Sequence, residues 1–499
     1  MTKPANPAAE PSPSEAGLPG AAQPVNELHD DPLSRPLTMA GKGPAVQRPE
    51  LGSLASRTAL SVSRSADDAA GVETPSVFNP ATAALANPYI WVMAGSVVFL
   101  LAYLFPPGAY SRLLGDRNHM FLDPQLLAFC GGCIVMTLIG LGLSKPRNRV
   151  DLAWQPLKSP LDGSPLTEWL LVVGLIVLNL GSVVVFERYG GMGAFAAGLN
   201  DGSMAKSLRT MSEDAGGKLW LAMIMPSSIF APVVMQICRS KPPRSIWRWA
   251  LWIFAITFLV AAGVAGKRNY LARPLFAALL VMLVWPWSRK FTFGKAVGLM
   301  ATAGVAVLGL FLVYAKLRTQ GWEADDGLRD VVRYVLAPYN VSTLIIRDQL
   351  VLPGSGQGYF WLTMFWEFPV LTQLFDLTAV HDRWVGEAAP FGVFQRGPIL
   401  MEYGITSGTS IPAFACSYVD FGWLGILPFL PAAYLGGLFW RSFRRGHLVG
   451  LIYYPIFAWA CVEWRANMLF PSTIVSYAIL FHVVLLVLRA LESVPRRAS

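Results

Sequence analysis

The chain has 499 residues, of which 54% are hydrophobic and 14% are charged, and its formal net charge is +9. Soluble chains carry about 25% charged residues, so this composition, with a mean hydropathy of +0.45, predicts a membrane protein. Five cysteines in this length exclude a secreted disulfide scaffold, and the apolar runs exclude a soluble domain with one core. The positive charge does not indicate nucleic acid binding, because most Lys and Arg lie in short loops between apolar segments.

The N-terminal segment, residues 1–80, differs in composition from the rest of the chain. It has no aromatic residue before Phe78, and Pro, Ala, Gly and Ser recur in it without a helical or strand period. Such a segment buries too little apolar surface to offset the entropy of ordering it. We therefore predict a disordered cytoplasmic tail over residues 1–80, and a second, short cytoplasmic tail over residues 491–499.

Ten apolar runs that are about long enough to span a bilayer predict an all-α polytopic membrane protein. They fall near residues 89–105, 125–144, 167–186, 219–237, 249–264, 271–286, 296–316, 412–439, 448–463 and 470–488. Residues 81–316 hold the first seven predicted helices, and residues 412–490 hold the last three. Between them lies one large loop, residues 317–411, for which a GT-C-like arrangement with short amphipathic or re-entrant helices is expected.

The orientation follows from the Lys and Arg content of alternate loops. With the N-terminus inside, the inner loops hold about 14 basic residues in about 50 positions, against about 16 in about 160 for the outer loops. Both termini are therefore predicted to be cytoplasmic. The outer loops at 187–218, 265–273 and 317–411 then contain most of the residues that could support chemistry.

Two segments of the large loop have a recognisable pattern. Residues 327–336 place apolar side chains on one face and Arg329 and Arg333 on the other, which predicts a helix lying along the membrane surface. Residues 360–375 are rich in Phe and Trp with a single charge, which indicates an interfacial or re-entrant helix. Together they predict a covered cavity at the outer leaflet.

The densest polar stretch of the chain follows these segments. Its candidate site residues are His381, Asp382, Arg396, Glu402 and Tyr403. A histidine suits a general base near neutral pH, and an arginine binds phosphate oxygens through two parallel N–H groups. An exposed histidine beside an aspartate is also a common surface pair, so that alternative stays open.

Basic residues in the shorter outer loops are candidates for substrate binding. Lys267 and Arg268 lie in a short outer loop that should be poor in positive charge, which indicates an anionic partner; snorkelling to lipid headgroups is the alternative. Arg188 and Arg209 make a weaker case of the same kind. Asp420, inside the predicted helix 412–439, is either functional or paired with Arg465 as a structural contact.

Three short stretches resemble one protein family. They are Glu187-Arg-Tyr-Gly-Gly191, Gly266-Lys-Arg268, and Ser417-Tyr-Val-Asp420-Phe-Gly422-Trp-Leu-Gly425 after a long outer loop. This layout resembles the bacterial Wzy-type oligosaccharide repeat-unit polymerases, which are relatives of the O-antigen polymerases. The resemblance implies activity at the periplasmic face of the bacterial inner membrane, on undecaprenyl-diphosphate-linked oligosaccharides. It also implies a chain-length regulator and a flippase as partner proteins, and an active role for Arg268, which matches the family's Gly-x-Arg arginine.

The residues themselves support a compatible division of roles. Transfer from a lipid diphosphate develops negative charge on the leaving group, and fixed cations stabilise that charge. Arg268 and Arg396 are the first candidates for this role, followed by Arg347 and Arg465. His381 is the first candidate for the base that activates an acceptor hydroxyl, followed by Glu402 and Asp382. We predict inversion at the anomeric carbon, no cofactor and no metal requirement, because the sequence has no cluster suited to a divalent ion.

Three alternatives remain open. An O-antigen ligase would share the architecture but would hand the glycan to lipid A core. A multi-spanning glycosyltransferase would carry an acidic catalytic residue in the first outer loop, where only Asp116 and Asp123 are present. A transporter or flippase of an anionic substrate would show charges along a path through many helices, and several of the predicted helices have none.

Overall fold

The computed structural model describes residues 80–145, 165–188, 268–285, 291–318, 324–352, 400–405, 411–464 and 473–493, with a few further positions between them. The chain divides into two compact units, residues 1–71 and 72–499, and all the described residues belong to the second. The predicted disordered tail therefore lies outside the described residues, apart from Pro80. Most of the predicted helices at 219–237 and 249–264 also lie outside them.

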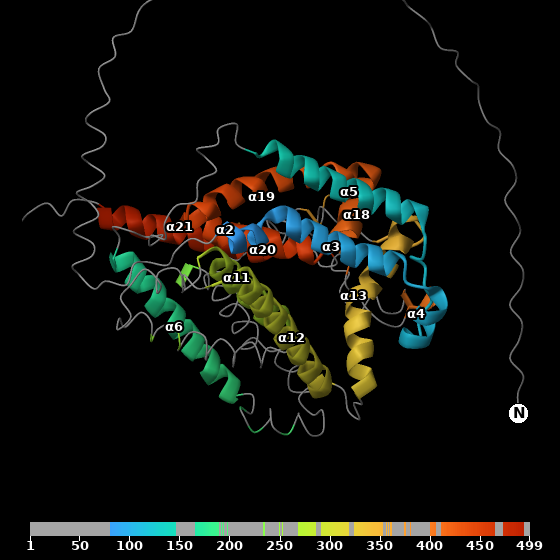
Figure 1. Cartoon of the computed structure of the whole chain (residues 1–499), viewed down its shortest axis with the longest axis horizontal. Helices are drawn as coiled ribbons and strands as arrows, with labels where there is room; N and C mark the ends of the chain where they lie inside the picture. Colours follow the sequence, from blue (N-terminus) through green and yellow to red (C-terminus); the bar gives the residue numbers. More distant parts are fainter. Residues whose placement is uncertain are drawn as a thin grey trace, which may run out of the picture. The chain divides into compact units, whose positions relative to one another are not determined.

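Every regular element within the described residues is a helix, as the sequence predicts for an all-α protein (Figure 1). The elements are α2 (Pro80–Ala83), η1 (Ala84–Ala86), α3 (Pro88–Tyr103), α4 (Pro107–Leu114), α5 (Pro124–Leu143), α6 (Pro165–Arg188), α11 (Arg268–Val284), α12 (Phe293–Arg318), α13 (Ala324–Ile346), α18 (Ala413–Phe421), η3 (Gly422–Ile426), α19 (Phe429–Arg444), α20 (Leu448–Val462) and α21 (Thr473–Ser493).

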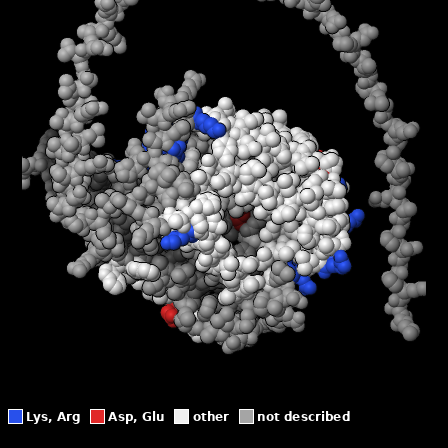
Figure 2. Space-filling model, viewed as in Figure 1, with Lys and Arg blue, Asp and Glu red and all other residues white. Residues whose placement is uncertain are grey.

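Two of the described helices, α5 and α21, are by themselves long and apolar enough to cross a membrane. Two bent pairs also pass the same test, α3 with α4 and the α18–η3 segment with α19, which raises the number of candidate spans to four. α6, α11, α12 and α20 contribute shorter apolar stretches. These apolar helices indicate a membrane protein, and the total of ten spans stays a prediction. Figure 2 agrees with this class, since it shows a largely uncharged face with Lys and Arg at its margins.

The predicted span 412–439 is interrupted at two points. Gly422 separates α18 from η3, and its φ of 56° and ψ of −138° lie in a region that residues with a Cβ rarely adopt. The α18–η3 segment then ends at Ile426 and meets α19, which begins at Phe429, at an angle of 96°. A similar bend of 92° separates α3 from α4, where Pro106 and Pro107 interrupt the helix.

The helix predicted at 327–336 is part of α13, which continues to Ile346, and its position along a membrane surface stays a prediction. From Arg329 to Val335 its residues are exposed or half-buried, but every residue from Leu336 to Ile346 is buried, and α13 packs against α3, α5 and α18. Protein, and not a membrane surface, therefore surrounds its second half. Phe99 of α3 meets Tyr339 in this contact, with ring centroids 5.5 Å apart.

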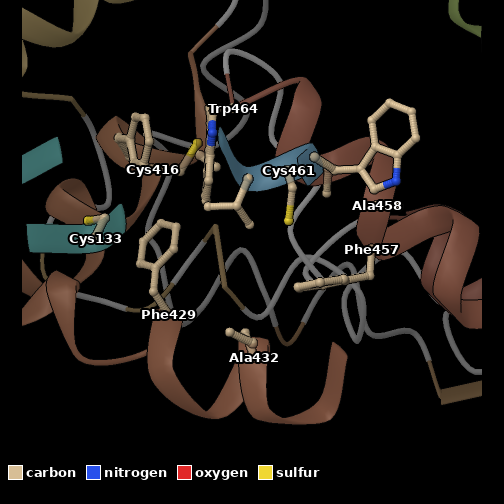
Figure 3. Close-up of a cluster of buried hydrophobic side chains, with 14 of the residues drawn as sticks. Cys133, Cys416, Phe429, Ala432, Phe457, Ala458, Cys461 and Trp464 are labelled. Atoms are coloured by element: carbon tan, nitrogen blue, oxygen red, sulfur yellow. The ribbon is translucent and has the colours of Figure 1, made fainter. Parts of the chain in front are cut away.

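Small residues bring the helices close together. Gly140 of α5 lies against the Leu430 carbonyl of α19, and Gly95 of α3 lies against the Cys461 carbonyl of α20, so that an added Cβ would overlap either oxygen. Small residues at such contacts let two helix backbones approach each other closely. In a membrane this packing holds helices together, because lipid tails are as apolar as the side chains and burial from lipid adds little. Figure 3 shows the buried cluster beside them, where the ring of Trp464 faces Phe429 at a centroid distance of 6.1 Å.

The contacts between helix ends agree with an alternating topology. Thr82 donates to the Leu283 carbonyl at 2.6 Å, and the Glu492 carboxylate accepts from the Thr167 hydroxyl at 2.9 Å. These four residues lie at ends that the charge count predicts to be inner. At the other side, the Ala413 N–H donates to the Trp464 carbonyl at 2.9 Å. Ends that are predicted to share one side of the membrane therefore contact one another.

Candidate site at the predicted outer ends

A group of hydrogen-bonded polar residues, which we call the polar cluster, joins five segments of the chain. The segments are the turn between α4 and α5, the N-cap of α5, the second half of α13 with the residues that follow it, residues 400–405, and α18. The cluster consists of Arg117, His119, Asp123, Asn340, Arg347, Asp348, Gln349, Tyr403 and Tyr418. All of these segments belong to, or adjoin, loops that the sequence predicts to be outer.

The ion pair between Asp123 and Arg347 is the main charged contact of the polar cluster. Asp123 is the N-cap of α5, and its Oδ1 accepts the Leu126 N–H at 2.7 Å. Its Oδ2 accepts the Nε–H of Arg347 at 2.5 Å and also contacts Nη2. The Asp123 side chain is 1% exposed, whereas that of Arg347 is 35% exposed. A buried carboxylate therefore holds the guanidinium of a side chain that stays partly exposed.

Both members of this pair adjoin a residue with an uncommon backbone conformation. Leu122 has a φ of 51° and Asp348 a φ of 54°, and among the described residues no other non-glycine residue has a positive φ. An aspartate tolerates this left-handed region, but a leucine rarely adopts it. The Leu122 N–H donates to the Tyr103 carbonyl at 3.3 Å, which ties the strained turn to the end of α3. Strain of this kind often accompanies functional sites.

His119 lies in the turn between α4 and α5 and connects this turn to α13 and to residues 400–405. Its backbone N–H donates to Oδ1 of Asn340 at 2.6 Å, and Nδ2 of Asn340 donates to the Arg117 carbonyl at 2.7 Å. Nε2 of His119 lies 3.0 Å from the Tyr403 carbonyl, and the Arg117 N–H donates to the Gly404 carbonyl at 2.9 Å. Because a carbonyl only accepts, the hydrogen of a neutral imidazole lies on Nε2, and Nδ1 carries the lone pair.

The surroundings of His119 disfavour its protonated form. Burial lowers its pKa below the ordinary value of 6.5, and the charges of Arg117 and Arg347 lower it further. The hydrogen bond to Tyr403 raises the pKa and offsets part of this effect. His119 is therefore a neutral imidazole at pH 7.

Tyr403 and Asp348 complete the polar cluster. The Tyr403 hydroxyl donates to the Gln349 carbonyl at 2.5 Å, so this residue contacts both His119 and the segment that carries Arg347. The Tyr418 hydroxyl lies 3.1 Å from each carboxylate oxygen of Asp348. These bonds attach residues 346–349 to α18.

Asp420 binds backbone groups of the large loop. Its two carboxylate oxygens accept the N–H of Phe360 at 3.1 Å and the N–H of Trp361 at 2.7 Å, and the residue is 2% exposed. Nε1 of Trp361 donates to Oγ of Ser417 at 3.0 Å, and that hydroxyl donates to the Gly425 carbonyl at 2.6 Å. The Ser417-to-Gly425 motif thus anchors residues 360–361 at the break between α18 and α19.

The predicted site residues fall into three groups. In the first group the side chains are described. Arg347, Tyr403 and Asp420 make the contacts given above, and Glu402 is exposed. Arg188 is the last residue of α6 and Arg268 the first residue of α11. Outside the described residues lie Lys267, Arg209, His381, Asp382, Arg396 and Arg465. The structure therefore brings Arg347 and Tyr403 into one cluster, and it attaches Asp420 to a neighbouring segment.

Sequence reasoning missed His119, Arg117 and Asn340, and it considered Asp123 only as an acid of the first outer loop. The available signal was the polar run Asp116-Arg-Asn-His119, which stands directly before an apolar helix that begins with a proline. Asn340 gave no signal of its own, because it lies in the part of α13 where the sequence turns apolar.

The polar cluster combines a partly exposed guanidinium with an imidazole whose lowered pKa favours its neutral form. A fixed guanidinium can bind a carboxylate or a phosphate. Among the described side chains, no group of three His, Cys, Asp or Glu residues lies close enough to hold a metal ion. The chain matches no protein-family profile, no curated protein and no solved structure.

Proposed function

We propose that this chain is a polysaccharide polymerase that joins undecaprenyl-diphosphate-linked oligosaccharide repeat units. In this proposal the reaction takes place at the periplasmic face of the bacterial inner membrane, and both termini are cytoplasmic. The product is an O-antigen, a capsule or an exopolysaccharide. The proposal rests on the resemblance of three short sequence stretches and on the chemistry of the polar cluster.

The observation that carries the proposal is the half-exposed pair of Arg347 with Asp123. Breaking the bond to a lipid diphosphate leaves negative charge on the diphosphate oxygens, and a cation fixed before the reaction stabilises that charge without reorganising. Asp123 holds Arg347 by Nε and Nη2, and the Arg347 side chain is 35% exposed. A fixed and partly exposed guanidinium of this kind supports the proposed diphosphate contact.

Other residues complete the proposed mechanism. Arg268 and Arg396 are proposed to bind the same diphosphate, with Lys267, Arg188, Arg209 and Arg465 as further basic contacts. A base, for which His381, Glu402 and Asp382 are the candidates, removes the proton from the acceptor hydroxyl. That oxygen then attacks the anomeric carbon from the side opposite the diphosphate, which inverts the configuration.

The proposal can be tested in a strain that lacks its own copy of this gene. Arg347→Ala should reduce long-chain polysaccharide by about tenfold to a hundredfold, since it removes one charge-stabilising contact. Arg347→Lys should keep part of the activity, because lysine retains the positive charge but cannot donate two parallel N–H groups to one phosphate. The control is Arg112→Ala, which removes an exposed arginine of α4 whose Nε–H donates to the Gly108 carbonyl of its own helix and which, among the described residues, makes no contact with the polar cluster. It should give normal polymer.

The same strain separates the competing functions. Loss of a polymerase leaves single repeat units, whereas loss of a ligase leaves lipid-linked polymer that never reaches lipid A core. Loss of a flippase leaves repeat units on the cytoplasmic side. Normal chain length with Arg347→Ala at wild-type expression would show that this arginine does not bind the diphosphate.

A further inference from the structure

Three successive residues in the last turn of α18 bind the first part of the large loop. The Tyr418 hydroxyl lies 3.1 Å from both carboxylate oxygens of Asp348, and the Val419 carbonyl accepts the N–H of Gly356 at 2.7 Å. Asp420, the next residue, accepts two successive backbone N–H groups with its carboxylate. One helix turn therefore holds the loop at several points along its course.

The contact of Asp420 is a carboxylate on a pair of neighbouring amides. Oδ1 accepts the N–H of Phe360 at 3.1 Å, and Oδ2 accepts the N–H of Trp361 at 2.7 Å. Hydrogen bonds to a carboxylate are stronger than those between neutral groups. Because Asp420 is 2% exposed, water cannot readily replace either donor, and the buried carboxylate disfavours any arrangement in which they are lost. We call this contact the Asp420 clamp.

The short motif from Ser417 to Gly425 builds the Asp420 clamp. The left-handed φ of Gly422 ends α18 directly after Phe421. η3 then brings Gly425 against the Ser417 carbonyl, where an added Cβ would come within 2.3 Å of the oxygen. The Ser417 hydroxyl donates to the Gly425 carbonyl at 2.6 Å and accepts Nε1–H of Trp361 at 3.0 Å. The glycines thus fold the chain back, and the polar residues bind the loop.

The Asp420 clamp lies between two sets of candidate site residues in the sequence. Arg347 directly precedes Asp348, while the candidates His381, Asp382 and Arg396 follow Trp361. Arg347 is held by Asp123, which belongs to α5 and not to α18. The clamp therefore fixes the point from which the rest of the loop continues, and a different contact fixes the arginine.

We propose that Asp420 is a positioning residue, which clamps the large loop onto α18 and so sets the later residues of the loop relative to Arg347. This role in transfer rests on the proposed function, whereas the clamp rests on the contacts above. Asp420 acts through the loop and does not touch the substrate. A purely structural role is the alternative, and it would leave the turnover of the folded protein unchanged.

Hydrogen exchange of the full chain in proteoliposomes tests the clamp without any substrate. Asp420→Asn keeps the shape of the side chain, but its amide nitrogen donates, so the two N–H groups lose one of their acceptors. We expect the amides of residues 356–361 to exchange about tenfold faster or more, while those of α5 keep the wild-type rate. Asp330→Asn, the same substitution in an exposed pair of α13, should leave residues 356–361 unchanged.

Polymerisation kinetics in the same proteoliposomes test the role in transfer. With undecaprenyl-diphosphate-linked repeat units as substrate, Asp420→Asn should lower kcat by about tenfold to a hundredfold, because misplaced groups lose the advantage of orientation. KM should stay within about twofold of the wild type, since Asp123 still holds Arg347. Asp420→Ala removes both acceptors and should lower kcat further, and Asp330→Asn should leave both constants unchanged.

Unchanged exchange in Asp420→Asn would show that the clamp does not hold the loop, and faster exchange with a normal kcat would show that it has no part in transfer. Either result overturns the inference. If Asp420→Asn does not fold, Ser417→Ala removes only the acceptor of the Trp361 indole and should give a smaller change in the same direction. A wild type that never polymerises would refute the proposed function, and the exchange measurement alone would then decide the clamp.

Discussion

At the scale of single residues, Asp123 is the one whose role the structure defines best. It caps α5 and holds Arg347 with the same carboxylate. We predict that Asp123→Asn keeps the helix cap, since asparagine is equally good there, but releases the guanidinium. The free energy of unfolding should fall by about 1–3 kcal/mol, less than for a fully buried pair because Arg347 is accessible. Thermal unfolding in detergent measures the loss.

The matched control for this variant is Asp330→Asn on α13. Oδ1 of Asp330 lies 3.6 Å from Nη1 of Arg333, and both side chains are about a third exposed. Surface pairs of this type contribute about 0–1 kcal/mol, so the control should unfold within a degree or two of the wild type. Equal destabilisation by both variants would show that the Asp123 pair has no special role.

His119 gives a prediction about pH. Because burial lowers its pKa below 6.5 in the folded protein, the unfolded chain binds the proton more tightly. This contribution to stability is complete above pH 6.5 and is lost as the pH falls below that value. His119→Gln keeps an N–H for the Tyr403 carbonyl but does not titrate. The wild type should therefore lose more thermal stability than this variant between pH 7.5 and 5.5.

A parallel loss of stability in both proteins over this pH range would contradict the assignment. Comparison of His119→Ala with His119→Gln isolates the hydrogen bond, since neither variant titrates and only glutamine keeps a donor for the Tyr403 carbonyl. It should be less stable than the glutamine variant by about 1 kcal/mol at pH 7.5, because the Tyr403 carbonyl loses its donor.

At the scale of helices, the close contact of α5 with α19 is the feature most open to test. Gly140 lies against the Leu430 carbonyl, whereas Gly131 of the same helix has open space beside it. We predict that Gly140→Ala destabilises the protein by about 1–3 kcal/mol through overpacking. Gly131→Ala should be neutral or stabilising by up to about 1 kcal/mol, because alanine favours the helix. Similar melting temperatures for the two variants would rule out the tight contact.

The helices that the sequence predicts well are those with a continuous apolar run between clear stops. α5 begins at Pro124 and ends at Leu143, within one residue of the prediction at each end, because Asp123 caps it and charged residues follow it. The bend between η3 and α19 was not predictable in the same way. The apolar run continues from α18 through η3 into α19, and only the structure reveals the 96° angle between Ala413–Ile426 and Phe429–Arg444.

Only part of the candidate site could be predicted from the sequence, because some of its residues stand out in one loop and others are brought in by helix packing. Arg347 and Tyr403 stand out as polar residues in an outer loop, so the sequence could propose them. Their partners His119 and Asn340 come from segments more than 200 positions away from one another in sequence. A single sequence carries no signal for such a contact, which depends on how α13 packs against the turn before α5.

At the scale of the whole chain, the contacts between helix ends agree with the predicted alternation of the helices, and the assignment of the two sides stays a prediction. Gln125 lies in the first turn of α5 and Lys145 just beyond its last turn, and both are exposed. We predict that a membrane-impermeant maleimide, added to cells with a permeable outer membrane, labels Gln125→Cys but not Lys145→Cys. The wild type controls for the native thiols, of which the four described are buried. Labelling of Lys145→Cys alone would invert the topology and move the polar cluster to the cytoplasm.

The most direct measurement of the central claim uses the purified full chain in proteoliposomes, with undecaprenyl-diphosphate-linked repeat units as the only substrate. The length of the released glycan is then read on a gel. We predict a ladder whose steps are one repeat unit, and its near disappearance with Arg347→Ala but not with Arg112→Ala. Single repeat units throughout, or transfer only when lipid A core is supplied, would contradict a polymerase.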